Sequence, residues 1–512
     1  MKAYYLDKAK LYEPKIYKSV IEATRYGEPV PDDTQWFKYQ FLEKPPITDV
    51  KEGDSFCIDF GNHYTGYLSF YMNQLDFYPD APVKLQIKLA ESIYELATDF
   101  DAYKGELSAS WLQEEIIHID EPGPVTLPRR YAFRYIQVKV LAMGVGYSVK
   151  LSDFKITAVT SADVSKCKVD TLDPELRRID EVGCRTLANC MQRIFEDGPK
   201  RDRRLWIGDL RLQALTAYHV FGSVDVAKRC MYLFAGYTNS QGRVPRDIFQ
   251  GSKTTHCDGE WLLDYALMFP VCLCDYFTYT GDEELVNDLF SIADNQLRLA
   301  WRDTRDDIVM DPVKEILKQE NWWAHIDWSE GLNKVTSVQG VLLYALHKMI
   351  DLCQKTGRLE YVEEYQEQVK RLTNAALEKL YDNNLEYFIN DYDKRQLSVH
   401  SQIWMILGDV VVGEQAERLL LRVLQDKNAK QAGSPYMHHY VLEAFFKLGL
   451  KEEAFSYMKS YWGEMVRCGA DTYWEMFVPG DFSVTPYGDP VMNSCCHAWS
   501  CSVSYFIRKY WR

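Results

Sequence analysis

The sequence predicts a multidomain protein of mixed α and β structure, with an N-terminal antiparallel β-sandwich in residues 1–165 and an (α/α)6 toroid in residues 166–512. Two observations support this prediction. The chain has 512 residues, more than one ordinary hydrophobic core organises. The spacing of its apolar residues also changes near Ser165, from the alternation typical of strands to the period of helices. The two parts therefore belong to different structural classes.

The first third of the chain has the pattern of short strands. Segments such as SFCIDF, VKLQIKLAE, EEIIHID and AFRYIQVKVLAM are rich in β-branched and aromatic residues and partly alternate between apolar and polar. Turn-forming groups such as YPDAP and EPGP separate them. Several strands at this spacing favour an antiparallel sandwich. Residues 1–45 have a less clear pattern, and we expect them to add strands or a strap to the same domain.

The remaining two thirds have the pattern of helices. The segment DPELRRIDEVGCRTLANCMQRIF begins with an Asp-Pro start signal, and about twelve helical segments follow to the C-terminus, separated by breakers such as TGD and KTGR. Many joints are only a few residues long, which makes neighbouring helices antiparallel. Six such hairpins can close into a toroid. A solenoid is the alternative, but it would need a fixed-period repeat, which the sequence lacks.

Charge and composition argue against several partners. A formal charge of −15 opposes binding to nucleic acid, because affinity for a phosphate backbone comes mostly from lysine and arginine. We expect no membrane partner, since no apolar stretch reaches the ~20 residues that span a bilayer. Thirteen cysteines without framework spacing are typical of reduced thiols in a cytoplasmic protein, unless a leader peptide has been removed. No feature predicts an oligomeric state.

We expect neither a metal nor a cofactor. Cys495, Cys496 and His497 are adjacent, but a Zn²⁺ site needs about four ligands and no second cluster is near them in the sequence. Buried thiols beside a pocket histidine are the more common arrangement. The chain also lacks a Walker-type loop and a G-x-G-x-x-G segment, so nucleotide chemistry is unsupported.

The four longest joints of the helical part combine acids with aromatic residues. They lie near residues 196–208, 240–258, 304–330 and 468–493. Carboxylates that accept hydroxyl hydrogen bonds, beside flat apolar rings, are the groups that a sugar site requires. A toroid would bring such loops together at one mouth. For any single loop the ordinary interpretation is packing, or a salt-bridge network that holds the loop. Four loops together favour a carbohydrate site.

Several segments resemble the glycoside hydrolase family 78 α-L-rhamnosidases. DGPKRDRRLWIGD resembles their D-C-P-x-R-D-E-R-L-G-W-T-G-D signature, and GADTYWEMF resembles their G-A-T-T-F-W-E. HIDWSEG is similar to a short Asp-Trp segment, GSPYMHHYVLEAFFKLGLKEEAFSYMKSYWGEMV to the run into the last glutamate, and SCCHAWSCSVSYFI to a closing C-H-x-W-S segment. DFGNHYTGYLSF and LPRRYAFRYIQV look like strands of the preceding β domain. The resemblance covers roughly residues 50–510.

The resemblance implies a toroid that hydrolyses glycosides with inversion and needs no metal. An inverting enzyme uses an acid that protonates the leaving oxygen and a base that activates water on the opposite face of the sugar. Glu475 matches the family's base. The resemblance also implies substrate contacts. Two carboxylates, Asp197 and Asp209, would bind sugar hydroxyls, and Trp206 would form an aromatic wall. The further pocket residues are Asp327, Trp328 and His497, together with Arg201 and Trp474 from the first and last of the four joints.

The acid position is where this chain departs from the family. The family has a glutamate between two arginines, whereas this chain reads Arg201-Asp202-Arg203 and is one residue shorter before Trp206. Aligned from the Gly-Asp end, the acid falls on Asp202; aligned from Asp197, it falls on Arg203. We assign Asp202, because the role requires a carboxyl group and arginine does not release a proton near neutral pH.

The predicted function is inverting hydrolysis that releases a terminal α-L-rhamnosyl or similar deoxy-sugar residue from a small oligosaccharide or glycoside. One alternative keeps the fold and acts as a hydrolase or lyase on uronic acids or other glycans, with Arg203 and Arg204 clamping the substrate carboxylate. A second alternative is a non-catalytic sugar-binding relative whose acid has been lost at Arg203. A third, weaker alternative is a helical interaction scaffold, which would not need the polar aromatic loops.

Overall fold

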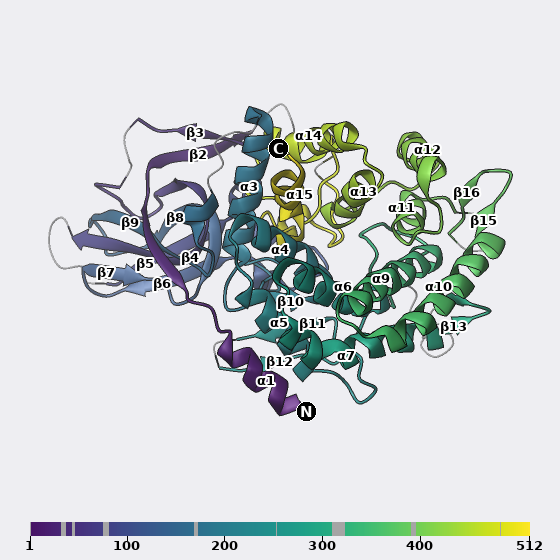
Figure 1. Cartoon of the computed structure of the whole chain (residues 1–512). Helices are drawn as coiled ribbons and strands as arrows, with labels where there is room; N and C mark the ends of the chain where they lie inside the picture. The colour runs from purple at the N-terminus through teal and green to yellow at the C-terminus, as the bar shows by residue number, and fades with distance from the viewer. Residues whose placement is uncertain are drawn as a thin grey trace.

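A computed structural model of the chain describes residues 2–31, 37–43, 47–74, 81–167, 173–251, 253–309, 323–390, 396–481 and 483–511. Figure 1 shows a β domain, in purple and blue, beside a larger helical domain that runs from teal to yellow. The strands of the β domain pair antiparallel in one nine-stranded sheet: β1 (Tyr17–Glu22), β2 (Arg25–Pro31), β3 (Phe37–Phe41), β4 (Ser55–Gln74), β5 (Val83–Ala90), β6 (Glu114–Ile119), β7 (Gly123–Thr126), β8 (Tyr131–Ala142) and β9 (Val149–Thr160).

The long strand β4 passes from one layer of the β domain to the other. Its first part, up to Gly66, pairs with β2 and β8, and its second part pairs with β9 and β7. The register against β8 shifts between Asp59 and Tyr64, and such an irregularity bends a strand. Phe56 in the first part meets Phe154 of β9 with ring centroids 6.0 Å apart. One hydrogen-bonded sheet thus folds over its own core as the predicted sandwich.

Twelve α-helices follow in the described part of the chain. They are α3 (Pro174–Cys190), α4 (Ile207–Val220), α5 (Asp225–Gly236), α6 (Leu263–Thr280), α7 (Glu283–Arg302), α9 (Val335–Lys355), α10 (Leu359–Lys379), α11 (Val399–Leu407), α12 (Gly413–Gln425), α13 (Pro435–Lys447), α14 (Lys451–Arg467) and α15 (Val503–Tyr510).

Six of these helices form a closed inner ring. Helices α4, α6, α9, α11 and α13 contact one another in that order, and the turn Ala498–Ser502 with α15 closes the ring between α13 and α4. The inner helices are buried over most of their length, as α4 and α11 illustrate. An outer helix such as α10 buries only one face, through Tyr365, Leu372 and two alanines. The (α/α)6 toroid is confirmed.

The lead segment divides between the two domains. Strand β1 pairs with β9, and β2 pairs with β4. Helix α1 (Lys2–Leu11) instead packs on α5 of the toroid, where its Tyr5 and Ala9 are buried. The Tyr4 hydroxyl donates to Asp288 of α7 at 2.9 Å. The segment is therefore a strap that starts on the toroid and ends in the sheet.

Three further observations concern membrane spans, metal sites and cysteines. In the described part of the chain, no helix combines the length and apolar character needed to cross a bilayer. No group of three histidine, cysteine, aspartate or glutamate side chains among the described residues is arranged to hold a metal ion. All thirteen cysteines are free thiols, and nine of them are buried, where they pack as small apolar side chains.

Candidate active site

The long joints meet at one end of the toroid because each of them leads into an inner helix. Residues 191–206 lead into α4, residues 468–502 into α15, and the other two into α6 and α9. Inner helices of successive hairpins run in the same direction, so their N-termini share this end. Residues 310–322, in the third joint, lie outside the described residues. The joints enclose a pocket of about 190 Å³, called here the mouth pocket.

Acids, aromatic rings and two histidines line the mouth pocket. The lining residues are Leu107, Asp197, Arg201, Asp202, Trp206, Asp209, Leu262, Tyr265, His325, Trp328, Glu475, Tyr487, His497 and Trp499. Eight of the ten side chains that the sequence predicts for the site are among them. The two exceptions are Asp327 and Trp474, described below.

Glu475 lies on the joint after α14 and is buried. Its carboxylate accepts hydrogen bonds from the Arg201 guanidinium and the Tyr487 hydroxyl, and the Ser494 amide approaches it at 3.4 Å. Burial opposes ionisation, but the charge of Arg201 and the surrounding donors bring the net pKa of Glu475 below its ordinary value. Glu475 is therefore ionised at neutral pH, which is the state that a general base needs.

Asp202 stands at the edge of the same pocket, with 25% of its side chain exposed. Asp202 and Arg203 both have left-handed backbone angles, with φ of 62° and 53°, a conformation that costs free energy in residues other than glycine. After this turn Arg203 reaches the β domain and donates to the Arg130 carbonyl at 3.0 Å. Asp202 lies 3.4 Å from Arg201, which also contacts Glu475. One guanidinium thus connects the two predicted catalytic carboxyl groups.

Asp197 and Asp209 are two further buried carboxyl groups of the pocket. Asp209 lies in the first turn of α4, where the helix dipole favours an acid, and Asp197 accepts a hydrogen bond from the Arg204 amide at 2.9 Å. Burial, together with the neighbouring acids, raises the pKa of both carboxyl groups well above the ordinary range. The Oδ1 atom of Asp209 has no hydrogen-bond partner among the described residues. It is available to a ligand hydroxyl.

His497 lies among three of these carboxyl groups. Its Nε2 atom is 3.9 Å from Asp197 and 4.0 Å from Glu475, and its Nδ1 atom is 3.9 Å from Asp209. Burial lowers the pKa of His497 to about 4 and the pKa of His325 to about 3. Both imidazoles are therefore neutral at pH 7, where each offers one hydrogen-bond donor and one acceptor.

Aromatic rings form the walls around these polar groups. Trp206 meets Tyr265 edge-on with centroids 6.3 Å apart, and Trp328 meets Tyr487 at 6.0 Å. Trp499 lies beneath the Glu475 segment and donates its indole N–H to the Glu475 carbonyl at 3.0 Å. Carboxyl groups between flat apolar faces match the two surfaces of a sugar ring, its hydroxyls and its C–H face.

Asp327 does not line the pocket, contrary to the prediction. Its buried carboxylate accepts hydrogen bonds from His400 Nε2 at 2.7 Å, from the Gly433 amide at 2.7 Å and from the Ser434 amide at 3.0 Å. These contacts tie the joint before α9 to the joint before α13. Trp328, the next residue, is the one that faces the pocket.

Asp327→Asn is expected to lower the free energy of unfolding by about 3 kcal/mol, because it leaves buried donors without the carboxylate that satisfies them. Thermal or denaturant unfolding measures this loss. The folded variant should retain substrate binding. If the variant is as stable as the wild type but has lost substrate affinity, Asp327 contacts the substrate and the structural role is wrong.

Trp474 also lies outside the mouth pocket, although it directly precedes Glu475 in the chain. Glu475 faces the mouth pocket, and Trp474 lines a separate pocket of about 120 Å³ between the two domains. Tyr94 and Tyr135 of the β domain contribute to the same wall. The structure thus places Trp474 at the domain interface and not among the residues of the mouth pocket.

Several lining residues carry no recognisable signal in the sequence. Tyr487 lies in YGDP, which has the pattern of a turn, and Tyr265 lies within the apolar run of α6. Leu107 comes from the β domain and reaches the pocket across the domain boundary. His325 and Trp499 lie in the segments HIDWSEG and SCCHAWSCSVSYFI, in which the sequence predicts neighbouring residues, Asp327, Trp328 and His497, as site residues. The sequence could identify the segments that contain His325 and Trp499, but not the direction in which these side chains point.

A closed ring of six helical hairpins with acids and aromatic rings at one mouth defines a six-hairpin glycosidase. Two comparisons of the sequence agree. Residues 165–510 match the bacterial alpha-L-rhamnosidase 6 hairpin glycosidase domain, and residues 31–158 match the glycosyl hydrolase family 78 alpha-rhamnosidase N-terminal domain. The chain belongs to glycoside hydrolase family 78, the α-L-rhamnosidase family.

Solved structures resemble the whole chain. A rhamnosidase from Klebsiella oxytoca with rhamnose bound is 36% identical, with a TM-score of 0.94 over 100% of this chain and 99% of its own. A family 78 rhamnosidase of Bacillus sp. GL1 is 20% identical, with a TM-score of 0.76 over 92% of this chain and 49% of its own. The α-L-rhamnosidase from Dictyoglumus thermophilum is 16% identical, with a TM-score of 0.70 over 96% of this chain and 51% of its own. These last two likenesses concern the fold alone. A search of curated proteins finds no match.

Proposed function

We propose that this enzyme releases a terminal α-L-rhamnosyl or similar deoxy-sugar residue from a small oligosaccharide or glycoside by inverting hydrolysis. The observation that carries the proposal is the placement of Glu475 and Asp202 in one pocket, in contact with the same guanidinium of Arg201. The full-length likeness to a rhamnosidase with rhamnose bound supports the choice of sugar. Leu107 and Leu262 offer an apolar surface for the methyl group of a 6-deoxy sugar.

In the proposed mechanism, Glu475 removes a proton from water, and the water oxygen bonds to the anomeric carbon on the face opposite the leaving group. Asp202 donates its proton to the glycosidic oxygen as the bond to that oxygen breaks. The partly exposed position of Asp202 suits a group that meets the leaving aglycone at the pocket entrance. Asp197, Asp209 and His497 would bind the sugar hydroxyls.

The stereochemistry of the first product tests this mechanism. We expect proton NMR of the hydrolysis of 4-nitrophenyl α-L-rhamnopyranoside to detect β-L-rhamnose first, followed by its slow mutarotation, because water attacks opposite the leaving group. A panel of other nitrophenyl glycosides, including the glucuronide, serves as the specificity control. Initial release of the α-anomer would contradict inversion, and preferential hydrolysis of the glucuronide would contradict the choice of sugar.

The uronic-acid alternative has weaker support. It requires Arg203 and Arg204 to hold a substrate carboxylate, but neither residue lines the mouth pocket. Arg203 donates to the Arg130 carbonyl, and Arg204 pairs with Asp247 at 3.3 Å. Arg201, which does line the pocket, already contacts two carboxylates. The non-catalytic alternative also has weaker support, because it assumes that the acid is lost at Arg203, whereas Asp202 lines the pocket together with Glu475.

A further inference from the structure

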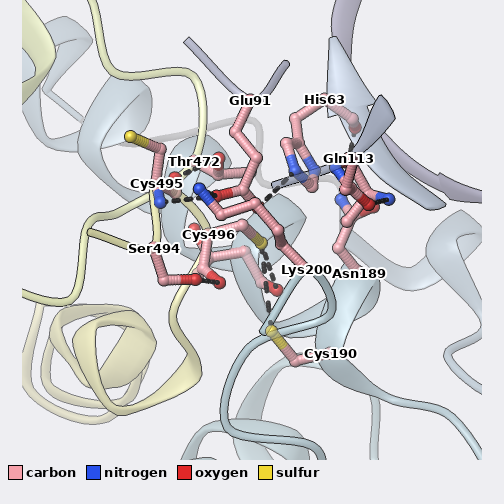
Figure 2. A network of polar contacts seen from close by, with 12 residues as sticks. His63, Glu91, Gln113, Asn189, Cys190, Lys200, Thr472, Ser494, Cys495 and Cys496 are labelled. Atoms are coloured by element: carbon pink, nitrogen blue, oxygen red, sulfur yellow. Dashed lines mark hydrogen bonds and ion pairs between the residues drawn. The ribbon is translucent and has the colours of Figure 1, made fainter. Parts of the chain in front are cut away.

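A buried polar network at the domain interface joins both proposed catalytic loops to one carboxylate of the β domain (Figure 2). Glu91 follows β5 and is buried. Its Oε1 atom lies 3.1 Å from Nε2 of His63 on β4, and its Oε2 atom accepts a hydrogen bond from the Cys495 amide at 2.7 Å. The same Oε2 atom lies 3.3 Å from Nζ of Lys200. Three separate segments of the chain thus converge on Glu91.

Two of these partners adjoin the groups of the proposed mechanism. Lys200 directly precedes Arg201, whose guanidinium contacts Glu475. Cys495 directly follows Ser494, whose carbonyl accepts a hydrogen bond from the Glu475 amide at 2.9 Å. Glu91 is therefore connected to Glu475 in two ways. One connection runs through Lys200 to Arg201, which contacts the Glu475 carboxylate, and the other runs through Cys495 to the Ser494 carbonyl, which binds the Glu475 amide.

Additional contacts link the two loops that carry Arg201 and Glu475. Lys200 donates to the Asn493 carbonyl at 3.1 Å, which joins the loop before α4 to the loop before α15. The Thr472 hydroxyl donates to the Cys495 carbonyl at 2.7 Å, and the His497 amide donates to the Tyr473 carbonyl at 2.8 Å. A shift at Lys200 or Cys495 is therefore transmitted to both loops.

Lys200 is a buried cation that depends on its carboxylate partners. It is 1% exposed, and its only other ion-pair partner among the described residues is Glu95 of α2 (Ile93–Ala97), at 3.3 Å. Burial opposes its charge, but Glu95 and Glu91 raise the net pKa of Lys200 above its ordinary value, so it stays charged. A buried charge that loses a partner seeks water or another acceptor. Movement of Lys200 would displace Arg201.

We propose that Glu91 is a positioning residue for hydrolysis, which acts through Lys200 and the Cys495 amide to hold Arg201 against Glu475. The proposal rests on the proposed function of Glu475 as the base. It makes the β domain part of the active site, because the carboxylate that aligns the two catalytic loops belongs to that domain.

Glu91→Gln tests the proposal through steady-state kinetics on 4-nitrophenyl α-L-rhamnopyranoside across the acid pH range. We expect kcat to fall about 10- to 100-fold with KM nearly unchanged, because misalignment of a catalytic group costs rate more than binding. We also expect the acid limb of the pH profile to move to higher pH. Burial raises the pKa of Glu475 and the charge of Arg201 lowers it. If the guanidinium of Arg201 is displaced, the effect of burial dominates and the pKa of Glu475 rises. The other titratable groups that face Glu475, namely Tyr487, His497 and Asp209, are unchanged in the variant.

Asp275→Asn is the matched control, because it removes a partly buried carboxylate that pairs with Lys348 at 2.8 Å and Arg211 at 2.9 Å elsewhere in the toroid. This control should lower the melting temperature without moving the acid limb. Glu91→Asp keeps the charge on a shorter arm and should show the same changes on a smaller scale, which provides the test if Glu91→Gln does not fold.

Wild-type kcat and an unmoved acid limb in the Glu91 variants would overturn the positioning role. This result differs from a failure of the proposed function, which would appear as a wild-type enzyme inactive on rhamnosides. In that case the same kinetics on the glycoside that the wild type hydrolyses test Glu91.

Discussion

Glu475→Gln is expected to lower kcat by about 10²- to 10⁴-fold, because the amide cannot take a proton from the attacking water. KM should change little, since glutamine keeps the shape of the side chain and its amide oxygen can still accept the hydrogen bond from Arg201. In the wild type, kcat/KM should fall with decreasing pH as Glu475 becomes protonated. The pKa of Glu475 lies below its ordinary value of 4.5, so the midpoint of this limb should lie below that pH. Steady-state kinetics over the acid range measure both effects.

Glu443→Gln is the matched control for Glu475→Gln. Glu443 of α13 has the same kind of partners, Arg211 at 2.8 Å and the Tyr344 hydroxyl at 2.5 Å, but it lies outside the mouth pocket. We expect a lower melting temperature and a kcat near the wild-type value. A comparable loss of kcat in both variants would mean that Glu475 acts by stabilising the fold rather than as the base.

Asp202→Asn is expected to lower kcat/KM by about 10²-fold or more for substrates with a poor leaving group, such as a second sugar, because the leaving oxygen then departs without its proton. The loss should be much smaller for a 2,4-dinitrophenyl rhamnoside, whose leaving group needs little protonation. Kinetics on a series of aryl and alkyl rhamnosides measure this dependence.

The control for Asp202→Asn is Asp258→Asn. Asp258 also pairs with an arginine, Arg246 at 2.7 Å, but it lies outside the mouth pocket, so activity should be unchanged. A loss of the same size for every leaving group in the Asp202 variant would show that Asp202 is not the acid. Asp209, whose pKa burial raises, would then be the next carboxyl group to test.

Much of the fold could be predicted because its signals are local. The alternation in segments such as SFCIDF and the helical spacing after Ser165 are properties of consecutive residues. The packing of α1 on the toroid escaped prediction because its partner, α5, lies far away in the sequence. Its buried residues Tyr5 and Ala9 show no strong amphipathic pattern by themselves.

The candidate site could be predicted by segment more reliably than by side chain. Glu475 and Trp474 are adjacent in the sequence, yet only Glu475 faces the mouth pocket. Asp327 and Trp328 differ in the same way. The direction of each side chain depends on the conformation of its joint, which distant partners such as His400 determine. No motif encodes those partners.

The sequence by itself determined that a β-sandwich precedes a ring of helical hairpins and that acids and aromatic residues occupy the long joints, since periodicity and composition belong to contiguous stretches of chain. Only the tertiary structure decided which acids share a pocket, which carboxyl groups have raised or lowered pKa values, and which β-domain carboxylate contacts Lys200 and Cys495. Those properties depend on burial and on charges brought close by closure of the ring, and both arise between residues that are hundreds of positions apart.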